Sequence, residues 1–442
     1  MTSLMDLLGR VPLGRTALLS PAGEMTYGDI RHMVDANESV IKMIGGTNVV
    51  INGRDRFEFS KILFLLDGKV NNILFIPPDI DQSLHNRYYQ EVNINYEVYL
   101  EKNILRYKTI SSPATELNPK ETFWIIPTSG TTNIPKLVAH TFNSLTRSTK
   151  ANIEIGSEFV WGLVFDIYRF SGIQVFLQAM LSGSSLIVTE SETGLPAVIA
   201  RLTSSSCNAL SATPSFWRKA LMCPGVDKLN LRIITLGGEI ADKTILECLR
   251  SNFPESKITH IYASTEAGVG FSVSDGLPGF PKSYIDSGLS GVRLGVSETR
   301  TLMIRNVIDP CSHLLNENLY DNCGFVDTGD VLDVQDDRVY FLGRDSGAIN
   351  VGGNKVQPEE VESVLLSSGF VSAAFVYPKK SAIIGNIVCA NLVLQGNSMD
   401  GRALKGEIMT HCRASLESFK VPAIIKFVDD IETTHSGKLK RS

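Results

Sequence analysis

The stretch IIPTSGTTNIPKLVAH, residues 125–140, gives the first indication of the fold. Apolar Ile125 and Ile126 lead into a loop in which four hydroxyl-bearing residues surround Gly130, and Lys136 ends the loop before apolar residues resume. Exposed backbone N–H groups, hydroxyl groups and a cation can together replace the water around a phosphate. The stretch therefore predicts a strand that ends in an anion-binding loop, although a plain polar surface loop has the same composition. It is not a P-loop of the GxxxxGK[ST] type, because no glycine directly precedes Lys136 and no hydroxyl follows it.

Short apolar runs rich in Val and Ile alternate with longer amphipathic stretches along the chain. The run LRIITLGG (231–238) predicts a buried strand, and it is followed by an expected helix over residues 242–252 and by a further strand, KITHIYAS (257–264). Such alternation is typical of βαβ units, in which helices cover a parallel sheet. The sequence therefore predicts an α/β fold.

The pattern of apolar and polar residues changes near residue 325. In VLDVQDDRVYFLGR two alternating strands meet at Asp336 and Asp337, which predicts a hairpin. The glycine-rich DSGAINVGGNK (345–355) that follows is expected to form a hinge or linker. We therefore expect a large N-terminal domain over residues 1–343 and a small α+β domain over residues 344–442.

The composition limits the classes of function. The 442 residues carry a net charge of -5 and show no basic stripe, so no nucleic-acid partner is expected. The N-terminus lacks the pattern of a signal peptide, and no apolar run is long enough to cross a bilayer. The seven cysteines are scattered and form no CxxC pair, which argues against zinc and against a disulfide framework. These features favour a cytoplasmic protein that does not bind membranes.

The segment YASTEAG (262–268) follows directly after the strand KITHI. The ring of Tyr262 could stack on a purine, the hydroxyl of Thr265 could reach a phosphate oxygen, and the carboxylate of Glu266 is the type of ligand that Mg²⁺ prefers. A packed tyrosine and a solvated glutamate are the ordinary alternative for such a peptide.

Three further polar residues lie at positions where a ligand could be bound. Asp330, in FVDTGDV, could accept both hydroxyls of a ribose, although an Asx turn is the commoner use of such a residue. Arg344 stands at the end of a predicted strand. Lys438, in HSGKLKR, lies in a basic C-terminal tail that is ordinary when taken alone.

In this order the segments resemble the superfamily of acyl-adenylate-forming enzymes, which comprises acyl- and aryl-CoA ligases, peptide-synthetase adenylation domains and luciferases. The family patterns TSGTTGxPK, YGxTE, TGD, GRxxDxIKxxGxxIxPxEVE and SGKxxR recur here as TSGTTNIPK, YASTE, TGD, GRDSGAINVGGNKVQPEEVE and SGKLKR. The resemblance covers nearly the whole chain. It implies a large N-terminal domain of stacked β-sheets and helices with a small, mobile α+β C-terminal domain.

The resemblance also implies roles for individual residues. Lys438 would be the catalytic lysine, with Thr265 at the α-phosphate and Glu266 on Mg²⁺. Nucleotide contacts are implied for Thr128, Ser129, Gly130, Thr131, Thr132, Lys136, Gly238, Glu239, Tyr262, Ala263, Asp330 and Arg344. The acid pocket would involve Phe165, Tyr168, Arg169, Ile173, Phe216 and Gly237, and the thiol channel would involve Gly352 and Gly353.

The chain departs from the family pattern at several positions. Asn133 replaces the second glycine of the hydroxyl-rich loop, and Asn tolerates left-handed backbone geometry. Ala263 replaces the glycine of YGxTE and adds a methyl group beside the expected acid pocket. Ser346 stands where an aspartate is frequent at the hinge, which leaves the energetics of hinge rotation open. Arg169 falls where many family members carry a histidine; it could pair with a carboxylate of the substrate or with an acid of the protein itself.

The expected activity is ATP- and Mg²⁺-dependent conversion of a small carboxylic acid to an acyl-AMP with release of pyrophosphate. The acyl group would then pass to the thiol of CoA or of the phosphopantetheine on a separate acyl carrier protein. Two alternatives remain open: transfer to an amine, or a non-catalytic sensor of nucleotide or acyl-AMP.

Overall fold

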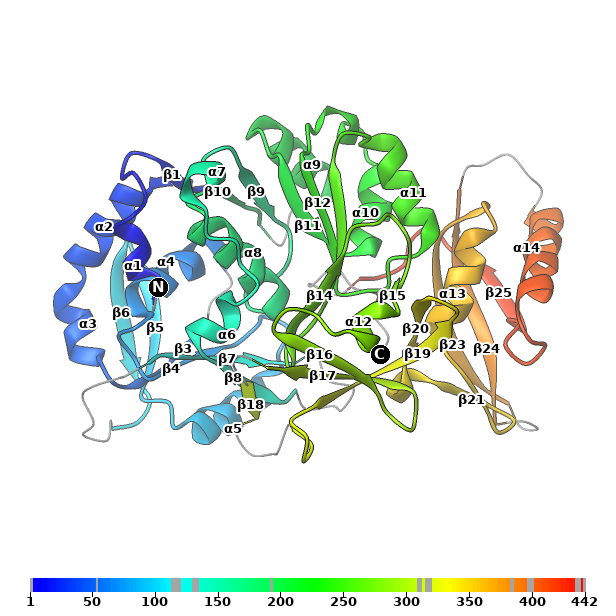
Figure 1. Cartoon of the computed structure of the whole chain (residues 1–442). Coiled ribbons are helices and arrows are strands. Elements are labelled where there is room, and N and C mark those ends of the chain that lie inside the picture. Colours follow the sequence, from blue (N-terminus) through cyan, green and yellow to red (C-terminus); the bar gives the residue numbers. More distant parts are fainter. Residues whose placement is uncertain are drawn as a thin grey trace.

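The computed structural model describes residues 3–52, 55–112, 121–128, 135–190, 194–307, 312–314, 320–381, 385–395, 401–433 and 439, with residues 312–314 described by their backbone. Within these residues the strands form four β-sheets. Figure 1 shows the N-terminal elements (blue) at one end, the C-terminal elements (orange) at the other, and the green elements between them.

The largest sheet has eight strands and supplies one wall of the candidate site. Its six inner strands pair in parallel, and the two outermost pairs are antiparallel. The predicted strand over residues 257–264 is confirmed as β13. In spatial order the strands are β14 (Gly268–Val273), β13 (Lys257–Ser264), β12 (Ile233–Gly237), β11 (Ala209–Ala212), β9 (Val160–Leu163), β10 (Ser185–Val188), β1 (Thr16–Ser20) and β2 (Gly23–Thr26).

Helices pack on both faces of this sheet, as its mostly parallel strands require. On one face lie α9 (Leu195–Ser204), α10 (Pro214–Leu221) and α11 (Lys243–Asn252), whose apolar side chains share a core with β11 and β12. Asp242 caps α11 by accepting a hydrogen bond from the N–H of Ile245, which confirms the helix start that the sequence predicted.

The other face of the eight-stranded sheet meets a second sheet, of seven strands. The core between them contains α4 (Arg56–Leu66) and α8 (Phe170–Leu181). The strands, in spatial order, are β18 (Ser312–Leu314), β8 (Leu137–His140), β7 (Phe123–Pro127), β4 (Asn72–Phe75), β3 (Asn48–Ile51), β5 (Tyr96–Glu101) and β6 (Ile104–Thr109). Further helices of this half are α1 (Met5–Leu8), α2 (Tyr27–Ala36), α3 (Glu38–Ile44), α5 (Gln82–Val92), α6 (Phe142–Thr146) and α7 (Ile153–Gly156).

The third sheet is antiparallel and shares a small core with β14. It consists of β15 (Phe280–Pro281), β20 (Arg338–Arg344), β19 (Val326–Gln335), β17 (Thr301–Asn306) and β16 (Val292–Val296), with α12 (Ser283–Asp286) beside them. The predicted hairpin at Asp336 and Asp337 is confirmed as the connection from β19 to β20.

The fourth sheet and two helices form the C-terminal end of the molecule, and they have a core of their own (Figure 1). The strands are β22 (Asn354–Val356), β21 (Ile349–Val351), β24 (Gly385–Leu394), β23 (Val371–Ser381) and β25 (Ile424–Phe427), and the helices are α13 (Pro358–Ser367) and α14 (Gly401–Ser415). Most of the glycine-rich patch, which was expected as a hinge or linker, forms the β21–β22 hairpin, whose turn is made by Gly352 and Gly353 at φ of 57° and 92°. None of the described helices is long and apolar enough to cross a membrane.

Candidate active site

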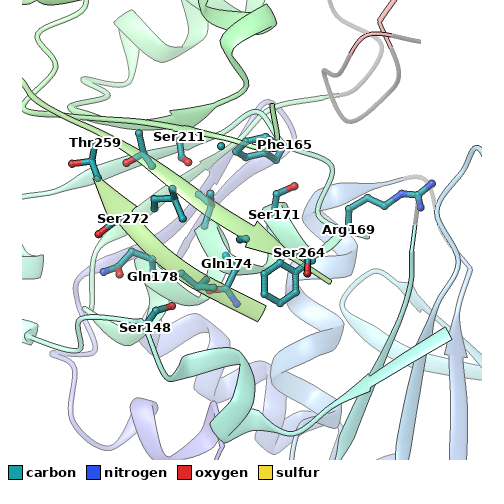
Figure 2. A pocket seen from close by; sticks show the side chains of 18 of the residues that line it. Ser148, Phe165, Arg169, Ser171, Gln174, Gln178, Ser211, Thr259, Ser264 and Ser272 are labelled. Atoms are coloured by element: carbon teal, nitrogen blue, oxygen red, sulfur yellow. The ribbon is translucent and has the colours of Figure 1, made fainter. Parts of the chain in front are cut away.

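A pocket of about 400 Å³ lies between α8 and the face of β11, β12 and β13. Figure 2 shows side chains from the sheet, among them Ser211 and Thr259, on one side of it and Gln174 and Gln178 on the other. One end of the pocket is lined by residues at the carboxyl ends of the strands, where ligands bind in open α/β sheets. This position makes it the candidate active site.

Helix α8 divides its side chains between the pocket and the core. Ser171, Gln174 and Gln178 line the pocket, and their spacing of three and four residues places them on one face of a helix. Phe176 and Met180, on the opposite face, are fully buried between the two large sheets. The helix is thus fixed by apolar packing while it presents polar groups to the pocket.

The strand-end region brings together several residues that the sequence singled out. Gly237, Gly238 and Ala263 line the pocket, together with Thr265 and Glu266 of the YASTE segment. Gly238 has a φ of 81°, a left-handed conformation that favours glycine and lets the backbone turn beside the pocket. The polar groups at this end therefore include hydroxyls and a carboxylate beside the turn at Gly238.

Tyr262, Asp330 and Arg344 meet beside this end, although they are far apart in the sequence. The hydroxyl of Tyr262 donates a hydrogen bond to one oxygen of Asp330, and Nε of Arg344 donates to the other oxygen at 3.1 Å. Burial and the nearby carboxylate of Asp330 raise the pKa of Tyr262 well above its ordinary value, so the hydroxyl stays protonated as the donor. Burial alone would lower the pKa of Arg344, but the pKa is raised by the nearby Asp330, Tyr262 and Glu266.

The ring of Tyr262 is stacked within an aromatic cluster. Its centroid lies 5.0 Å from that of Phe341 with nearly parallel planes, and 5.3 Å from that of Phe271. Tyr262 is also absent from the pocket lining, whereas Arg344 contributes to it. In this structure Tyr262 therefore contacts Phe341 where the sequence suggested a purine.

The two ends of the hydroxyl-rich loop are held together by the backbone. The N–H of Thr128 donates to the carbonyl of Lys136 at 2.8 Å, and the N–H of Lys136 donates to the hydroxyl of Thr128 at 3.2 Å. Thr128 also lines the pocket. The loop is therefore anchored at the pocket; Ser129, Gly130, Thr131 and Thr132 lie outside the described residues.

The C-terminal segment contacts the large N-terminal part next to the pocket. Glu239 accepts hydrogen bonds from the N–H of Leu439 at 2.9 Å and, through its other oxygen, from the N–H of Ser215 at 2.9 Å. A second contact is made by Lys219 of α10, whose ammonium group lies 2.9 Å from a carboxylate oxygen of Asp430. Lys438 lies outside the described residues, but its neighbour Leu439 is thereby placed beside Gly238 and Glu239.

The remaining predicted residues are distributed around the pocket and beyond it. Phe165 and Arg169 line the pocket. The guanidinium group of Arg169 lies 2.6 Å from Asp79, so it is paired with an acid of the protein. In contrast, Tyr168, Ile173 and Phe216 do not belong to the lining: Tyr168 and Ile173 are at most 1% exposed, and Phe216 packs against the core on the other face of the sheet. Gly352 and Gly353 lie in the β21–β22 turn and do not line the pocket.

Sequence reasoning missed the polar residues in the body of the pocket. Among them are Ser211, Thr235 and Thr259 on the strands and Gln174 and Gln178 on α8. A signal was present, because Thr235 and Thr259 interrupt apolar strands and the glutamines recur at helical spacing. The pairing of the strands, which brings the hydroxyls together, is not visible in one sequence.

Comparison with known proteins gives the family. The model of the AMP-binding enzyme family matches residues 77–293, and the model of the AMP-binding enzyme C-terminal domain matches residues 360–438, which together are well over half of the chain. The curated relatives include the D-alanine–D-alanyl carrier protein ligase of Staphylococcus aureus, which is 25% identical over 365 residues, 76% of this chain and 73% of that protein.

Solved structures share the fold over almost the whole length. The anthranilate CoA ligase AuaEII, in complex with anthranoyl-AMP, has a TM-score of 0.80 at 16% identity, over 99% of this chain and 95% of that one. The o-succinylbenzoate CoA synthetase MenE from Bacillus subtilis, in complex with its acyl-adenylate, has a TM-score of 0.73 at 18% identity, over 99% and 97% of the two chains. The chain therefore belongs to the AMP-binding enzyme family, the superfamily of adenylate-forming ligases whose motifs its sequence carries.

Proposed function

We propose that this protein activates a carboxylic acid with ATP to an acyl-AMP, releasing pyrophosphate, and then transfers the acyl group to a thiol. A carboxylate resists attack by a nucleophile because it is negatively charged and has a poor leaving group. Transfer of AMP to the acid removes both obstacles. The pocket beside α8 would hold the acid, and the strand-end region would hold the nucleotide.

The contacts around Asp330 support the placement of the nucleotide. Its carboxylate is oriented by two donors, Tyr262 and Arg344, and each carboxylate oxygen can accept more than one hydrogen bond. Asp330 and Arg344 would thus contact the ribose. The stacked ring of Phe341 would have to part from Tyr262 if an adenine base were to lie on that ring face.

Thr265 and Glu266 are suited to the other end of the nucleotide. The acid attacks the α-phosphorus, and negative charge grows on the phosphoryl oxygens as pyrophosphate leaves. Thr265 lines the pocket and would donate its hydroxyl to the α-phosphate. Glu266 offers a carboxylate oxygen of the kind that Mg²⁺ prefers, and this residue lines the same end of the pocket. When bound there, the ion supplies positive charge to the phosphates.

The anchored loop would bind the outer phosphates. Thr128 and Lys136 hold its two ends together at the pocket, and the hydroxyls of Ser129, Thr131 and Thr132 and the backbone at Gly130 belong to the segment between them. Such a loop offers N–H and O–H donors to an anion.

The observation that carries the proposal is the hydrogen bond between Leu439 and Glu239. It brings the C-terminal segment to the same strand end that Thr265, Glu266 and Arg344 line. Lys438, the residue before Leu439, would supply a positive charge to the developing transition state. Because the segment follows the C-terminal sheet, we also propose that residues 344–442 act as a separate domain that carries this lysine to and from the site.

The acceptor is proposed from the relatives. The curated relatives are named as carrier protein ligases, and the solved structures with the same fold include CoA ligases. We therefore place a thiol, that of CoA or of carrier-bound phosphopantetheine, ahead of an amine. Gly352 and Gly353, in their exposed hairpin turn, would border the path of that thiol after a domain rotation.

The test is acid-dependent exchange of labelled pyrophosphate into ATP across a panel of carboxylic acids, followed by addition of CoA, a phosphopantetheine-loaded carrier or an amine. Exchange with at least one acid and loss of exchange in Glu266→Gln are expected. If none of the acids supports pyrophosphate exchange although the protein binds ATP, the sensor is favoured instead. Thioester formation on addition of a thiol would separate the proposed transfer from amide formation.

A further inference from the structure

We infer that the acid substrate carries hydrogen-bonding groups in the body of its acyl chain, such as hydroxyl groups, and is not a plain hydrocarbon acid. This inference rests on the proposed function and specifies the substrate class of that site. It starts from three hydroxyl-bearing residues that lie in one row across three adjacent strands. Ser211 of β11 is paired in register with Thr235 of β12, and Thr235 is paired with Thr259 of β13.

The row faces the pocket in the middle of its length. Alternate residues of a strand point to the same face, and the pocket is lined by Ile233, Thr235 and Gly237 of β12. Gly237 is at the nucleotide end, so the row lies two residues, about 7 Å, further along the strands. A group bound there would be several bonds away from the reacting carboxylate.

Among the described residues, these hydroxyl groups have no hydrogen-bond partner. Ser211 and Thr235 are only 9% and 8% exposed, yet their hydroxyls and that of Thr259 form no hydrogen bond to any other residue in the described part of the chain. They are not among the fully buried unpaired atoms of the described residues, so they face the open space of the pocket, where water or a ligand can bind them. Donors and acceptors that the protein leaves unused in a pocket are therefore available to a ligand.

The opposite wall is polar as well. The amide nitrogen of Gln174 donates to the carbonyl of Leu145 at 2.8 Å, which fixes this side chain and leaves its oxygen for the pocket. Gln178 is held by the backbone of Lys150 through both ends of its amide. Figure 2 shows both glutamines across the pocket from Thr259 and Ser211.

Aromatic residues complete the lining. Trp161, Phe165 and Phe170 are each at most 8% exposed and contribute apolar surface to the same pocket. The lining thus combines aromatic faces with a row of hydroxyls. A hydrocarbon chain would pack against the aromatic faces, but it would displace water from the hydroxyls without replacing the hydrogen bonds of that water, which costs binding free energy. A hydroxylated aryl or aliphatic acid satisfies both.

The test uses matched pairs of acids in the pyrophosphate exchange assay: phenylpropanoate against its para-hydroxy derivative, and octanoate against its terminal-hydroxy derivative. We expect the hydroxylated member of at least one pair to be preferred by about tenfold or more in kcat/KM. The double variant Thr235→Val, Thr259→Val keeps the side-chain shape, and β-branched Val is favoured in strands. It should lose this preference and raise the relative rate with the unsubstituted acid.

Two further variants make the result specific. Thr235→Ser with Thr259→Ser retains both hydroxyls and should retain the preference. Thr299→Val makes the same chemical change in an exposed turn outside the pocket and should leave the preference unchanged. Equal or better exchange with the unsubstituted acids, unaffected by the Val substitutions, would overturn the inference while leaving the proposed function intact. Absence of exchange with every acid tested would instead count against the proposed function.

Discussion

The hydrogen bond between Tyr262 and Asp330 can be removed by the loss of a single oxygen atom. In Tyr262→Phe the ring keeps its stacking on Phe341 and Phe271, at centroid distances of 5.0 and 5.3 Å. Asp330 keeps its bond from Arg344 but loses one of its two donors. The variant therefore isolates the orientation of the carboxylate proposed to bind the ribose.

The size of the effect follows from the surroundings of the carboxylate. A hydrogen bond to a charged group contributes about 1.5 to 3 kcal/mol. The side chain of Asp330 is 17% exposed and Arg344 remains as a second partner, so water can replace part of the lost interaction. We expect the lower end of the range, about 1.5 kcal/mol in the free energy of unfolding. We also expect the Kd for ATP to rise by up to about tenfold, because a less ordered carboxylate binds the ribose less well.

Urea unfolding and calorimetric titration with ATP measure the two quantities. Tyr284→Phe is the matched control, because Tyr284 lies in the same aromatic cluster but donates a weaker bond, 3.3 Å long, to the backbone carbonyl of Ser272. It should change neither quantity by more than a fraction of these values. If Tyr262→Phe binds ATP as tightly as the unmodified protein, the proposed role of the Tyr262–Asp330 pair is refuted.

Three more predictions concern other parts of the molecule. Burial raises the pKa of the Asp67 carboxyl from 3.8 to about 6. The stability that this shift contributes is therefore full below pH about 4 and is lost as the pH rises through about 6. In urea unfolding, Asp67→Asn should remove up to about 3 kcal/mol of this pH dependence. In Glu239→Gln one carboxylate oxygen becomes an NH₂ donor that faces the N–H of Leu439 or Ser215, so the rate of pyrophosphate exchange should fall several-fold with little change in ATP affinity. An unchanged rate would speak against this contact. Arg169→Ala removes a pocket-lining cation and frees Asp79 from its 2.6 Å pair; a changed order of acids in the exchange panel is expected, and an unchanged order would make the pair purely structural.

Local sequence patterns predicted much of the fold. Helix α11 was predicted over residues 242–252, and the structure shows Asp242 as its cap; the β19–β20 hairpin was predicted from alternation around Asp336 and Asp337. The glycine-rich patch was expected as a hinge or linker, and most of it forms a hairpin, because Gly352 and Gly353 suit a tight hairpin turn as well as a linker. Local patterns indicate turns and helix caps, but a pair of glycines alone does not distinguish a hairpin turn from a linker.

The candidate site was predicted less completely. The motifs located Thr265, Glu266 and Arg344, which the fold brings to one end of a pocket. Tyr168 was expected in the acid pocket, yet its ring packs on Phe59 with a centroid distance of 4.2 Å. The hydroxyl row was not anticipated, since it depends on the register of strands that are separated by helices in the sequence. Side-chain direction and strand register arise from tertiary packing, which one sequence does not display.

The central claim is that a lysine at the C-terminal end of the chain meets the nucleotide at the strand end lined by Thr265 and Glu266. The most direct measurement is acid-dependent pyrophosphate exchange in Lys438→Ala, with ATP affinity measured on the same sample. The account predicts that exchange falls by about a hundredfold or more, as for loss of one preplaced donor to a transition state, while the Kd for ATP changes by less than about tenfold. Exchange at the rate of the unmodified protein would contradict it.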